Sequence, residues 1–142
     1  MELQDFVQQR VKEYYWEDDV NCATTTLKIL SERFGIELSS QVIDSALGMH
    51  GAGKYGAQCG LVEGMLMFLG ILGRAQNIPD DRIVEACRCF ARQFEQQFSS
   101  LLCRDLRPEG FHSDNPPHLC ETLTCDAVCF NIEFVQQVFC QT

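Results

Sequence analysis

The stretch "AQCGLVEGMLMFLGILG", residues 57–73, decides the fold expected of this chain, because its apolar run predicts a buried helix. Gly56, Gly60 and Gly64 recur four residues apart and would form a flat stripe on one side of that helix. Glycine inside a helix costs about 1 kcal/mol relative to alanine, so three in register indicate that another helix approaches closely. The stretch is too short to cross a bilayer.

The rest of the chain also shows helical spacing of its apolar residues, and no segment has the pattern of a strand. We expect a first helix over Gln4–Trp16 and a second over 22–34, which Asn21 caps and Gly35 ends. The remaining predicted helices run from Ser39 or Ser40 to Gly48, from Asp80 or Asp81 to about Leu102, and onward from a cap at Thr122 or Thr124. The prediction is an all-α, single-domain bundle of about six helices over residues 1–142, with a glycine-rich loop before a buried central helix.

The composition excludes several classes of protein. With 46% hydrophobic and 22% charged residues among 142, the chain is typical of a globular domain. Its net charge of −9 argues against nucleic acid or an anionic membrane as a partner, since both require a basic face. The first ten residues, "MELQDFVQQR", lack the features of a secretory signal. We therefore expect a soluble cytoplasmic protein without a membrane span.

The glycine-rich loop, "GMHGAGKYGAQCG" over residues 48–60, has two interpretations. Its first half nearly matches a phosphate-binding loop, but Tyr55 stands where the Mg²⁺-ligating Ser or Thr is needed, and no strand precedes it. We interpret that match as accidental. His50 and Lys54 could lower the pKa of a nearby thiol or receive an anion, although loop solubility explains both residues equally well. The second half presents the thiol of Cys59 at the start of the apolar run.

The nine cysteines are an odd number, so they cannot all pair within one chain. In a reducing compartment such cysteines favour metal ligation or redox chemistry. Cys22, Cys59 and Cys125 fall at predicted helix starts, where the helix dipole favours a thiolate, so we expect lowered pKa values there, opposed at some positions by acidic neighbours. Three further cysteines are expected to be packing residues: Cys87, Cys89 and Cys140.

Three other residues could take part in such chemistry. His112 and His118 lie between Cys103 and Cys120, which makes a mixed Cys/His zinc site conceivable, although exposed loop histidines are the commoner explanation. Glu63 lies one helical turn after Cys59 and could accept its proton, although an ordinary partly exposed helix position explains it as well.

The segment "CGLVEGMLMFLGILG" after a glycine-rich loop resembles the family of redox-active proteins named for the pattern C…GCAxxG…C…C. By this resemblance Cys59 is the motif cysteine, and Gly60 and Gly64 are the motif glycines. The chain departs from the pattern at Leu61, where the family has alanine. The resemblance covers most of the chain and implies a redox or metal-binding role.

The resemblance also implies a set of four working cysteines. Cys22 matches the early cysteine and Cys103 the third. The fourth is open among Cys120, Cys125 and Cys129, and we favour Cys125 because it opens the predicted final helix. As metal ligands, four such thiols would hold an iron–sulfur cluster or zinc.

Two hypotheses from different classes follow. In the first, this is a redox protein whose four thiols bind a metal centre or exchange disulfides, with a redox partner protein as its counterpart. In the second, it is a non-enzymatic helical interaction module whose cysteines are packing residues. Its glycine stripe would then bind a partner or a second copy in a homodimer. Neither hypothesis names a substrate or a reaction.

Overall fold

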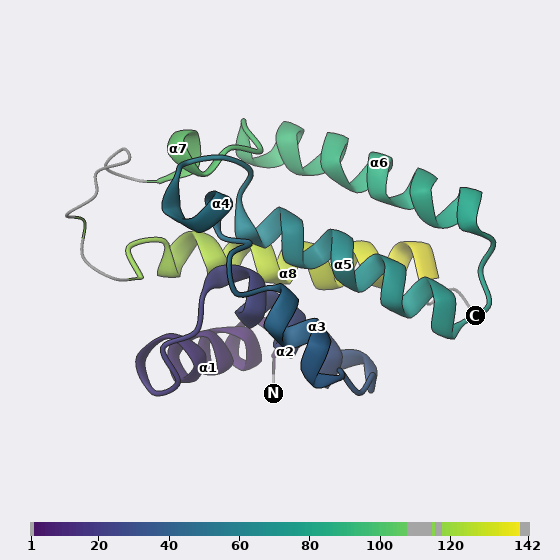
Figure 1. Ribbon diagram of the computed structural model, residues 1–142, viewed down its shortest axis with the longest axis horizontal. Helices are drawn as coiled ribbons and strands as arrows, with labels where there is room; N and C mark the ends of the chain where they lie inside the picture. The colour runs from purple at the N-terminus through teal and green to yellow at the C-terminus, as the bar shows by residue number, and fades with distance from the viewer. Residues whose placement is uncertain (1, 108–114, 116–117, 140–142) are drawn as a thin grey trace.

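The structure, a computed structural model, describes residues 2–107, 115 and 118–139. Within these residues the chain is all-α, as predicted, and its only strand-like pairing is one antiparallel β-bridge between Gln58 and Leu102. The bundle is drawn in Figure 1. The described helices are α1 (Leu3–Trp16), α2 (Cys22–Phe34), α3 (Ser40–Ser45), α4 (Gly51–Lys54), α5 (Gly60–Ala75), α6 (Asp80–Phe98), α7 (Cys103–Leu106) and α8 (Glu121–Phe139).

Helix α5 is the centre of the bundle and contacts α2, α6 and α8. Its Met65, Phe68 and Leu69 are fully buried, which confirms the predicted buried central helix. The helix begins at Gly60, three residues later than expected, because Cys59 is extended (φ −64°, ψ 139°) and serves as the N-cap. Gly56, at φ +97°, therefore lies in the loop and not on the helix.

The glycines Gly60 and Gly64 let α2 pack directly on α5. A Cβ at Gly64 would lie 2.6 Å from the Ala23 carbonyl oxygen, and one at Gly60 would lie 2.8 Å from the Ala23 amide nitrogen. Real Cβ atoms do not approach backbone so closely, so both positions require glycine. The predicted close helix approach is thus confirmed for these two glycines. The neighbour that fills the stripe is α2 of the same chain, which leaves it no room for a partner.

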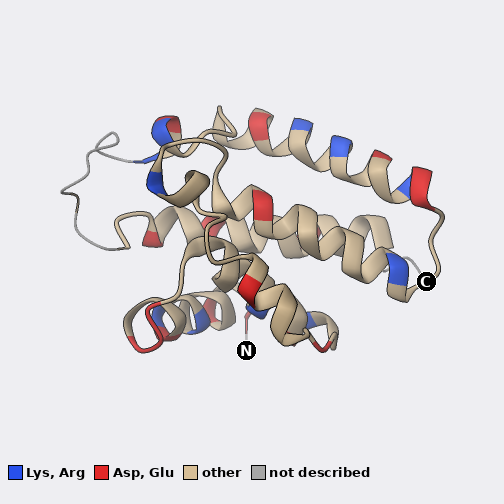
Figure 2. Ribbon diagram, viewed as in Figure 1, with Lys and Arg blue, Asp and Glu red and all other residues tan. Residues whose placement is uncertain are grey.

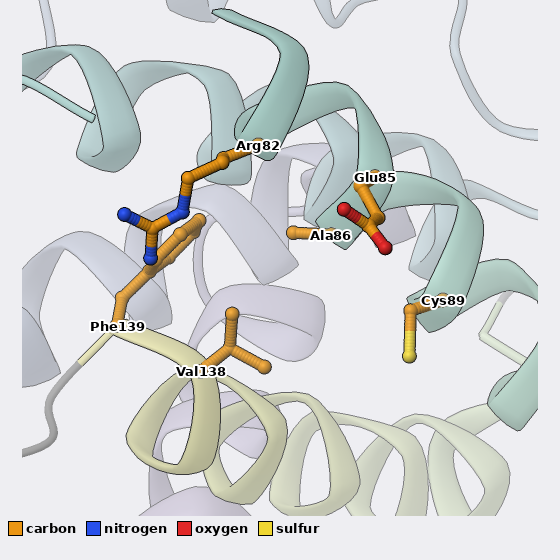
Figure 3. Close-up of a pocket in the computed structure, with 6 residues that line it drawn as sticks. All are labelled: Arg82, Glu85, Ala86, Cys89, Val138 and Phe139. Atoms are coloured by element: carbon orange, nitrogen blue, oxygen red, sulfur yellow. The ribbon is translucent and has the colours of Figure 1, made fainter. Parts of the chain in front are cut away.

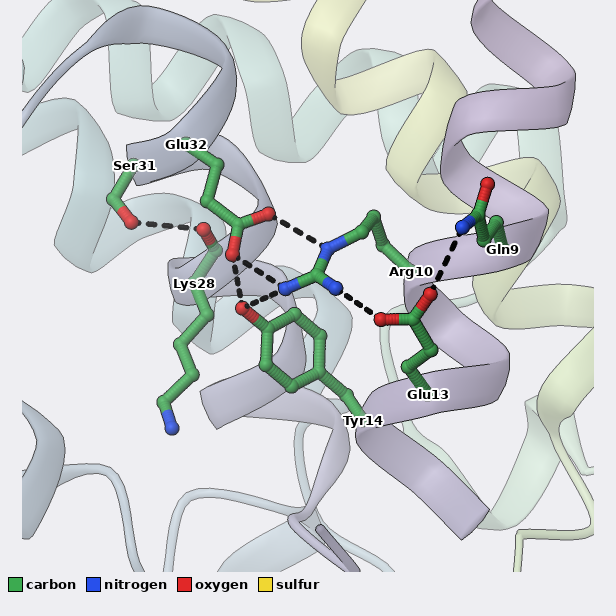
Figure 4. Close-up of polar contacts among 7 residues, drawn as sticks. All are labelled: Gln9, Arg10, Glu13, Tyr14, Lys28, Ser31 and Glu32. Carbon is green, nitrogen blue, oxygen red and sulfur yellow. Dashed lines mark hydrogen bonds and ion pairs between the residues drawn. The ribbon is translucent and has the colours of Figure 1, made fainter. Parts of the chain in front are cut away.

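Helix α2 has the predicted boundaries. The Asn21 side chain accepts the Thr24 amide hydrogen at 2.8 Å, and Gly35 adopts the left-handed conformation (φ +69°) that ends the helix. A polar network joins α2 to α1 (Figure 4). In it the Arg10 guanidinium donates to both carboxylate oxygens of Glu32, at 2.9 and 2.7 Å. This network fixes how α1 lies against α2.

Three further predicted boundaries are wrong. Helix α3 ends at Ser45, short of Gly48. Helix α6 ends at Phe98, because Ser99 turns into the left-handed region (φ +79°). Helix α8 begins at Glu121, ahead of both expected caps.

The sequence also failed to predict the short helices α4 and α7. Helix α4 is a single turn whose four residues all have positive φ, from 55° at Ala52 to 70° at Lys54, so it winds to the left. Left-handed conformation costs about 1–2 kcal/mol for each non-glycine residue, which Ala52 and Lys54 both incur. No helix in the described part of the chain is long and apolar enough to span a membrane.

Candidate functional site

Four cysteines from distant parts of the sequence meet where four helices begin. Cys22 is the first residue of α2, Cys59 is the N-cap of α5, Cys103 opens α7, and Cys120 directly precedes α8. In Figure 1 these helix starts gather at the end of the molecule that carries α4 and α7. Any two of these four thiols are close enough to interact electrostatically. We call this group the cysteine tetrad.

The β-bridge aligns two members of the tetrad. Around the pair Gln58–Leu102, the Cys59 amide donates to the Leu101 carbonyl at 2.8 Å, and the Cys103 amide donates to the Ala57 carbonyl at 2.7 Å. Side chains alternate along extended backbone, so Cys59 and Cys103 lie on the face of the bridge opposite to Gln58 and Leu102. The two thiols therefore share one side of a short ribbon as diagonal neighbours, with Cys59 opposite Leu101 and Cys103 opposite Ala57.

The glycine-rich loop is tied to the start of α2 beside the tetrad. Asn21 caps α2 and also donates through Nδ2 to the carbonyls of Ala46 (3.0 Å) and Leu47 (2.9 Å). The same nitrogen lies 3.1 Å from Nδ1 of His50. Burial, and then the charge of Lys54, lower the pKa of His50. His50 therefore joins the loop to α2 through Asn21.

The expected lowering of thiol pKa values is wrong, because burial outweighs the helix starts. Burial raises the pKa of Cys59 to about 12, even though the backbone N–H groups of Leu61 and Val62 oppose that rise. Burial, and then repulsion from Cys59, raise the pKa of Cys22 well above its ordinary value, against one N–H from Gly60. Amide hydrogens stabilise a thiolate, but removing the sulfur from water costs more. These thiols are therefore protonated near neutral pH.

Tyr15 is a buried neighbour of the tetrad that the sequence analysis did not select. Its hydroxyl lies 2.6 Å from the Thr124 hydroxyl, and Cys22, Cys59 and Cys120 are its electrostatic neighbours. Burial raises its pKa well above the ordinary value, so the phenol remains neutral. Tyr15 lies four residues after the apolar Val11, and this helical spacing was the signal in the sequence for its burial.

Two further side chains lie around Cys120. Burial raises the pKa of Cys120, and the positive charge of Arg107 opposes that rise. His118 stacks on the ring of Tyr15, with centroids 4.4 Å apart, and its Nε2 lies 2.8 Å from Oδ1 of Asp19. His118 thus attaches the segment before α8 to the end of α1. His112 lies outside the described residues.

Cys125 and Cys129 form a separate pair on α8. Burial and then the Glu121 carboxylate raise the pKa of Cys125 to about 11, with Cys129 and Asp126 as its further electrostatic neighbours. The structure therefore brings Cys22, Cys59 and Cys103 together with Cys120, one of the two alternatives to Cys125 left open by the resemblance. Cys125, which the sequence favoured, lies one turn further along α8.

The remaining candidates have other surroundings. The side chain of Glu63 hydrogen-bonds to Gln58, and burial raises the pKa of this carboxyl. Cys87 is half-buried against the core, consistent with a packing role. Cys89 accepts a hydrogen bond from Gln93 at 3.3 Å. Cys140 lies outside the described residues.

A shallow pocket lies between α6 and the end of α8 (Figure 3), and Cys89 is its only cysteine. Its lining residues are Arg82, Glu85, Ala86, Cys89, Val138 and Phe139. The pocket lies on α6 and on the C-terminal end of α8, whereas Cys120 precedes the opposite end of α8. We therefore place the candidate site at the tetrad.

The tetrad has the donor atoms of a Cys₄ site but not the arrangement that holds a single metal ion. Among the described residues, no group of three or more His, Cys, Asp or Glu side chains is placed to hold a metal ion. Zinc needs all its thiolates directed at one point, about 2.3 Å away. As they are placed, the four thiols do not fit a zinc site.

The comparisons with known proteins agree with the cysteine pattern. Residues 20–134 match the family model described as "Putative redox-active protein (C_GCAxxG_C_C)". No curated protein and no solved structure matches the chain. The matched range includes all four cysteines of the tetrad and both glycines that pack on α2. The chain therefore belongs to the C_GCAxxG_C_C family of redox-active proteins.

Proposed function

We propose that this protein is a thiol–disulfide redox protein and that the cysteine tetrad is its redox centre. The observation that carries the proposal is that four thiols, from four helix starts, lie close enough for each to interact electrostatically with the other three. A set of packing cysteines has no need to be grouped in this way. The interaction-module hypothesis also loses its proposed surface, since the glycine stripe is filled by α2.

Cys59 and Cys103 are the pair we propose to exchange. They lie on the same face of the bridge, and two ladder hydrogen bonds, of 2.8 and 2.7 Å, join their segments. Cys59 is 5% exposed, whereas Cys103 is half-buried, so Cys103 is the thiol that a reagent reaches. Cys22 and Cys120 then remain as a second pair of neighbouring thiols.

The step balances with a disulfide as the oxidant. A thiolate formed at Cys103 attacks one sulfur of that disulfide, which forms a mixed disulfide and releases the first external thiol. Cys59 then attacks the Cys103 sulfur, which closes the internal disulfide and releases the second. The two protein thiols lose two electrons and two protons, and the external disulfide gains them. The raised pKa of Cys59 makes its deprotonation the slow part of closure near neutral pH.

The competing use of the tetrad is as a metal ligand, and for a single zinc ion its thiols would have to rearrange from their present positions. We therefore propose no step through a metal. The experiment below distinguishes the two uses.

The test begins with protein purified without oxygen, whose iron, zinc and acid-labile sulfide are measured. The protein is then treated with glutathione disulfide, and its disulfides are mapped by mass spectrometry. We expect less than one metal ion per chain and one internal disulfide, Cys59–Cys103, that dithiothreitol reverses. Stoichiometric metal bound by the tetrad, or four thiols that stay reduced, would contradict the proposal.

Serine substitutions provide the controls. Cys59→Ser removes the disulfide and keeps an N-cap acceptor, because a Ser hydroxyl can also accept the N–H groups of Leu61 and Val62. Helical content should then remain unchanged. Cys125→Ser alters a thiol outside the tetrad and should leave the disulfide intact.

A further inference from the structure

The turn that carries Cys103 is bordered by exposed side chains of two kinds. Tyr55 and Leu102 are two of the large apolar residues that the surface exposes, at 77% and 37%. Lys54 and Arg104, both exposed and cationic, are their neighbours in sequence. We call these four residues, Lys54, Tyr55, Leu102 and Arg104, the Cys103 rim.

Backbone contacts hold the two halves of the rim together. The Cys103 amide donates to Ala57 at 2.7 Å, and the Arg104 side chain donates through Nε to the Gly56 carbonyl at 2.9 Å. A Cβ at Gly51 would lie 3.0 Å from Cβ of Cys103. The turn α4 is therefore packed directly against the Cys103 turn, and the rim belongs to one surface.

The rim has an unusual charge for this chain. The whole protein has a net charge of −9, whereas the rim contributes two cations. Figure 2 shows blue on α4 and α7, with red on α7 as well. That red is Asp105, whose carboxylate accepts a hydrogen bond from the Ser100 hydroxyl at 2.8 Å. An acidic partner is thus repelled by most of the molecule and attracted at this surface.

We propose that the Cys103 rim is the docking surface for a protein dithiol whose cysteines are flanked by apolar and acidic residues. This inference rests on the proposed function, because the partner reduces the Cys59–Cys103 disulfide. A partner thiolate attacks the Cys103 sulfur, which forms a mixed disulfide and frees Cys59. The second partner thiol then attacks the partner's own sulfur in that mixed disulfide and frees Cys103. The partner is oxidised to a disulfide, and two electrons and two protons pass to this protein.

The apolar residues of the rim, Tyr55 and Leu102, explain how a partner reaches a disulfide that is largely buried. Cys59 is nearly inaccessible, so attack must come at Cys103, in the turn that also carries Leu102 and packs against the turn before Tyr55. Covering these two side chains removes apolar surface from water and holds the attacking sulfur at that position. A small dithiol gains nothing from the rim, whereas a matched partner gains both contacts and charge attraction.

The experiment compares two synthetic dithiol peptides as reductants of the oxidised protein at low ionic strength. Both contain two cysteines flanked by leucines, and they differ only in carrying glutamates or lysines. We expect the acidic peptide to react about tenfold faster, with an advantage that 0.5 M salt or the double variant Lys54→Gln/Arg104→Gln removes. Equal rates for the two peptides would overturn the proposal.

Apolar substitutions test the other half of the rim. Tyr55→Ser and Leu102→Ser should each slow the acidic peptide several-fold. The matched control is Val84→Ser, which removes from α6 an apolar side chain whose exposure (58%) lies between those of Leu102 and Tyr55, and should change nothing. Equal effects at all three positions would overturn the docking surface. The rate with dithiothreitol should stay constant in every variant, and if dithiothreitol finds no disulfide to reduce, the proposed function itself has failed.

Discussion

The cysteine tetrad and the Cys125–Cys129 pair are two groups of neighbouring thiols with different capacities to form a disulfide. In the tetrad, burial raises the pKa of Cys22 and Cys59, and repulsion from other thiols on separate turns adds to that rise. On α8, the added repulsion comes from carboxylates, chiefly Glu121 for Cys125. Cys125 and Cys129 share one continuous helix, which fixes their Cβ atoms about 5–6 Å apart, beyond the roughly 3.5–4.5 Å that a disulfide spans. Cys59 and Cys103 are diagonal neighbours across the bridge, about 7–8 Å apart, but they lie on separate segments that can move closer to pair. The arrangement of the backbone, more than the thiol pKa, therefore decides which cysteines can oxidise in pairs.

The largest expected effect is the complete loss of the internal disulfide in Cys59→Ser. The substitution removes one of the two sulfurs but keeps the N-cap of α5. Titration of free thiols after treatment with glutathione disulfide measures the result, and circular dichroism verifies the helix content. Cys129→Ser is the matched change on α8, and a loss of the disulfide there would refute the distinction between the two groups.

The next effect concerns the packing that brings the tetrad together. Gly64→Ala would place a Cβ 2.6 Å from the Ala23 carbonyl oxygen, so we expect the free energy of unfolding to fall by about 2–3 kcal/mol. Gly70→Ala lies on the same helix with nothing within 4 Å, and should instead raise it by up to about 1 kcal/mol. Urea denaturation measures both. Similar values for the two variants would mean that α2 does not pack closely on α5.

A smaller effect should appear in alkaline solution. The pKa of Cys59 is about 12 in the folded protein against an ordinary value of 9.0, so the unfolded chain loses this proton first as pH rises. The thiol's contribution to stability is complete below about pH 9 and is lost between about pH 9 and pH 12. From about pH 8 to about pH 10, the wild type should lose about 1 kcal/mol more than Cys59→Ala, measured by urea denaturation. Parallel losses would show that Cys59 is not desolvated.

The smallest effect tests whether the Glu121 carboxylate contributes to the raised pKa of Cys125. Glu121→Gln removes the carboxylate charge next to Cys125 and keeps an oxygen to accept the Trp16 indole hydrogen, a contact of 2.6 Å. Alkylation of Cys125 near neutral pH should become about two- to threefold faster. Peptide mass spectrometry measures the rate, with Cys59 as the internal reference that should not change. An unchanged rate at Cys125 would show that the Glu121 charge does not contribute to its raised pKa.

The boundary of α8 explains why the sequence favoured Cys125 over Cys120. The pattern predicted a cap at Thr122 or Thr124, which would put Cys125 at the start of the helix. The helix begins at Glu121 instead, so Cys120 lies at its start and Cys125 in its second turn. Thr124 is fully buried, and its hydroxyl contacts Tyr15, a tertiary partner 109 residues away that no local pattern reveals.

Other features were predictable to different degrees for physical reasons. Asn21 and Gly35 fix the ends of α2 through local hydrogen bonds and a left-handed residue, and both are visible in the sequence. The turn α4 was not predictable, because its left-handed residues include Ala52 and Lys54, which do not favour that conformation. The sign of the thiol pKa shifts was also wrong, since helix starts are visible in a sequence and burial depth is not.

The most direct test of the tetrad as a redox centre is disulfide mapping after mild oxidation of protein purified without oxygen. The account predicts one reversible disulfide joining Cys59 to Cys103, with Cys125 and Cys129 still reduced. A disulfide confined to cysteines outside the tetrad, or a tetrad that retains four thiolates on a bound metal, would contradict it.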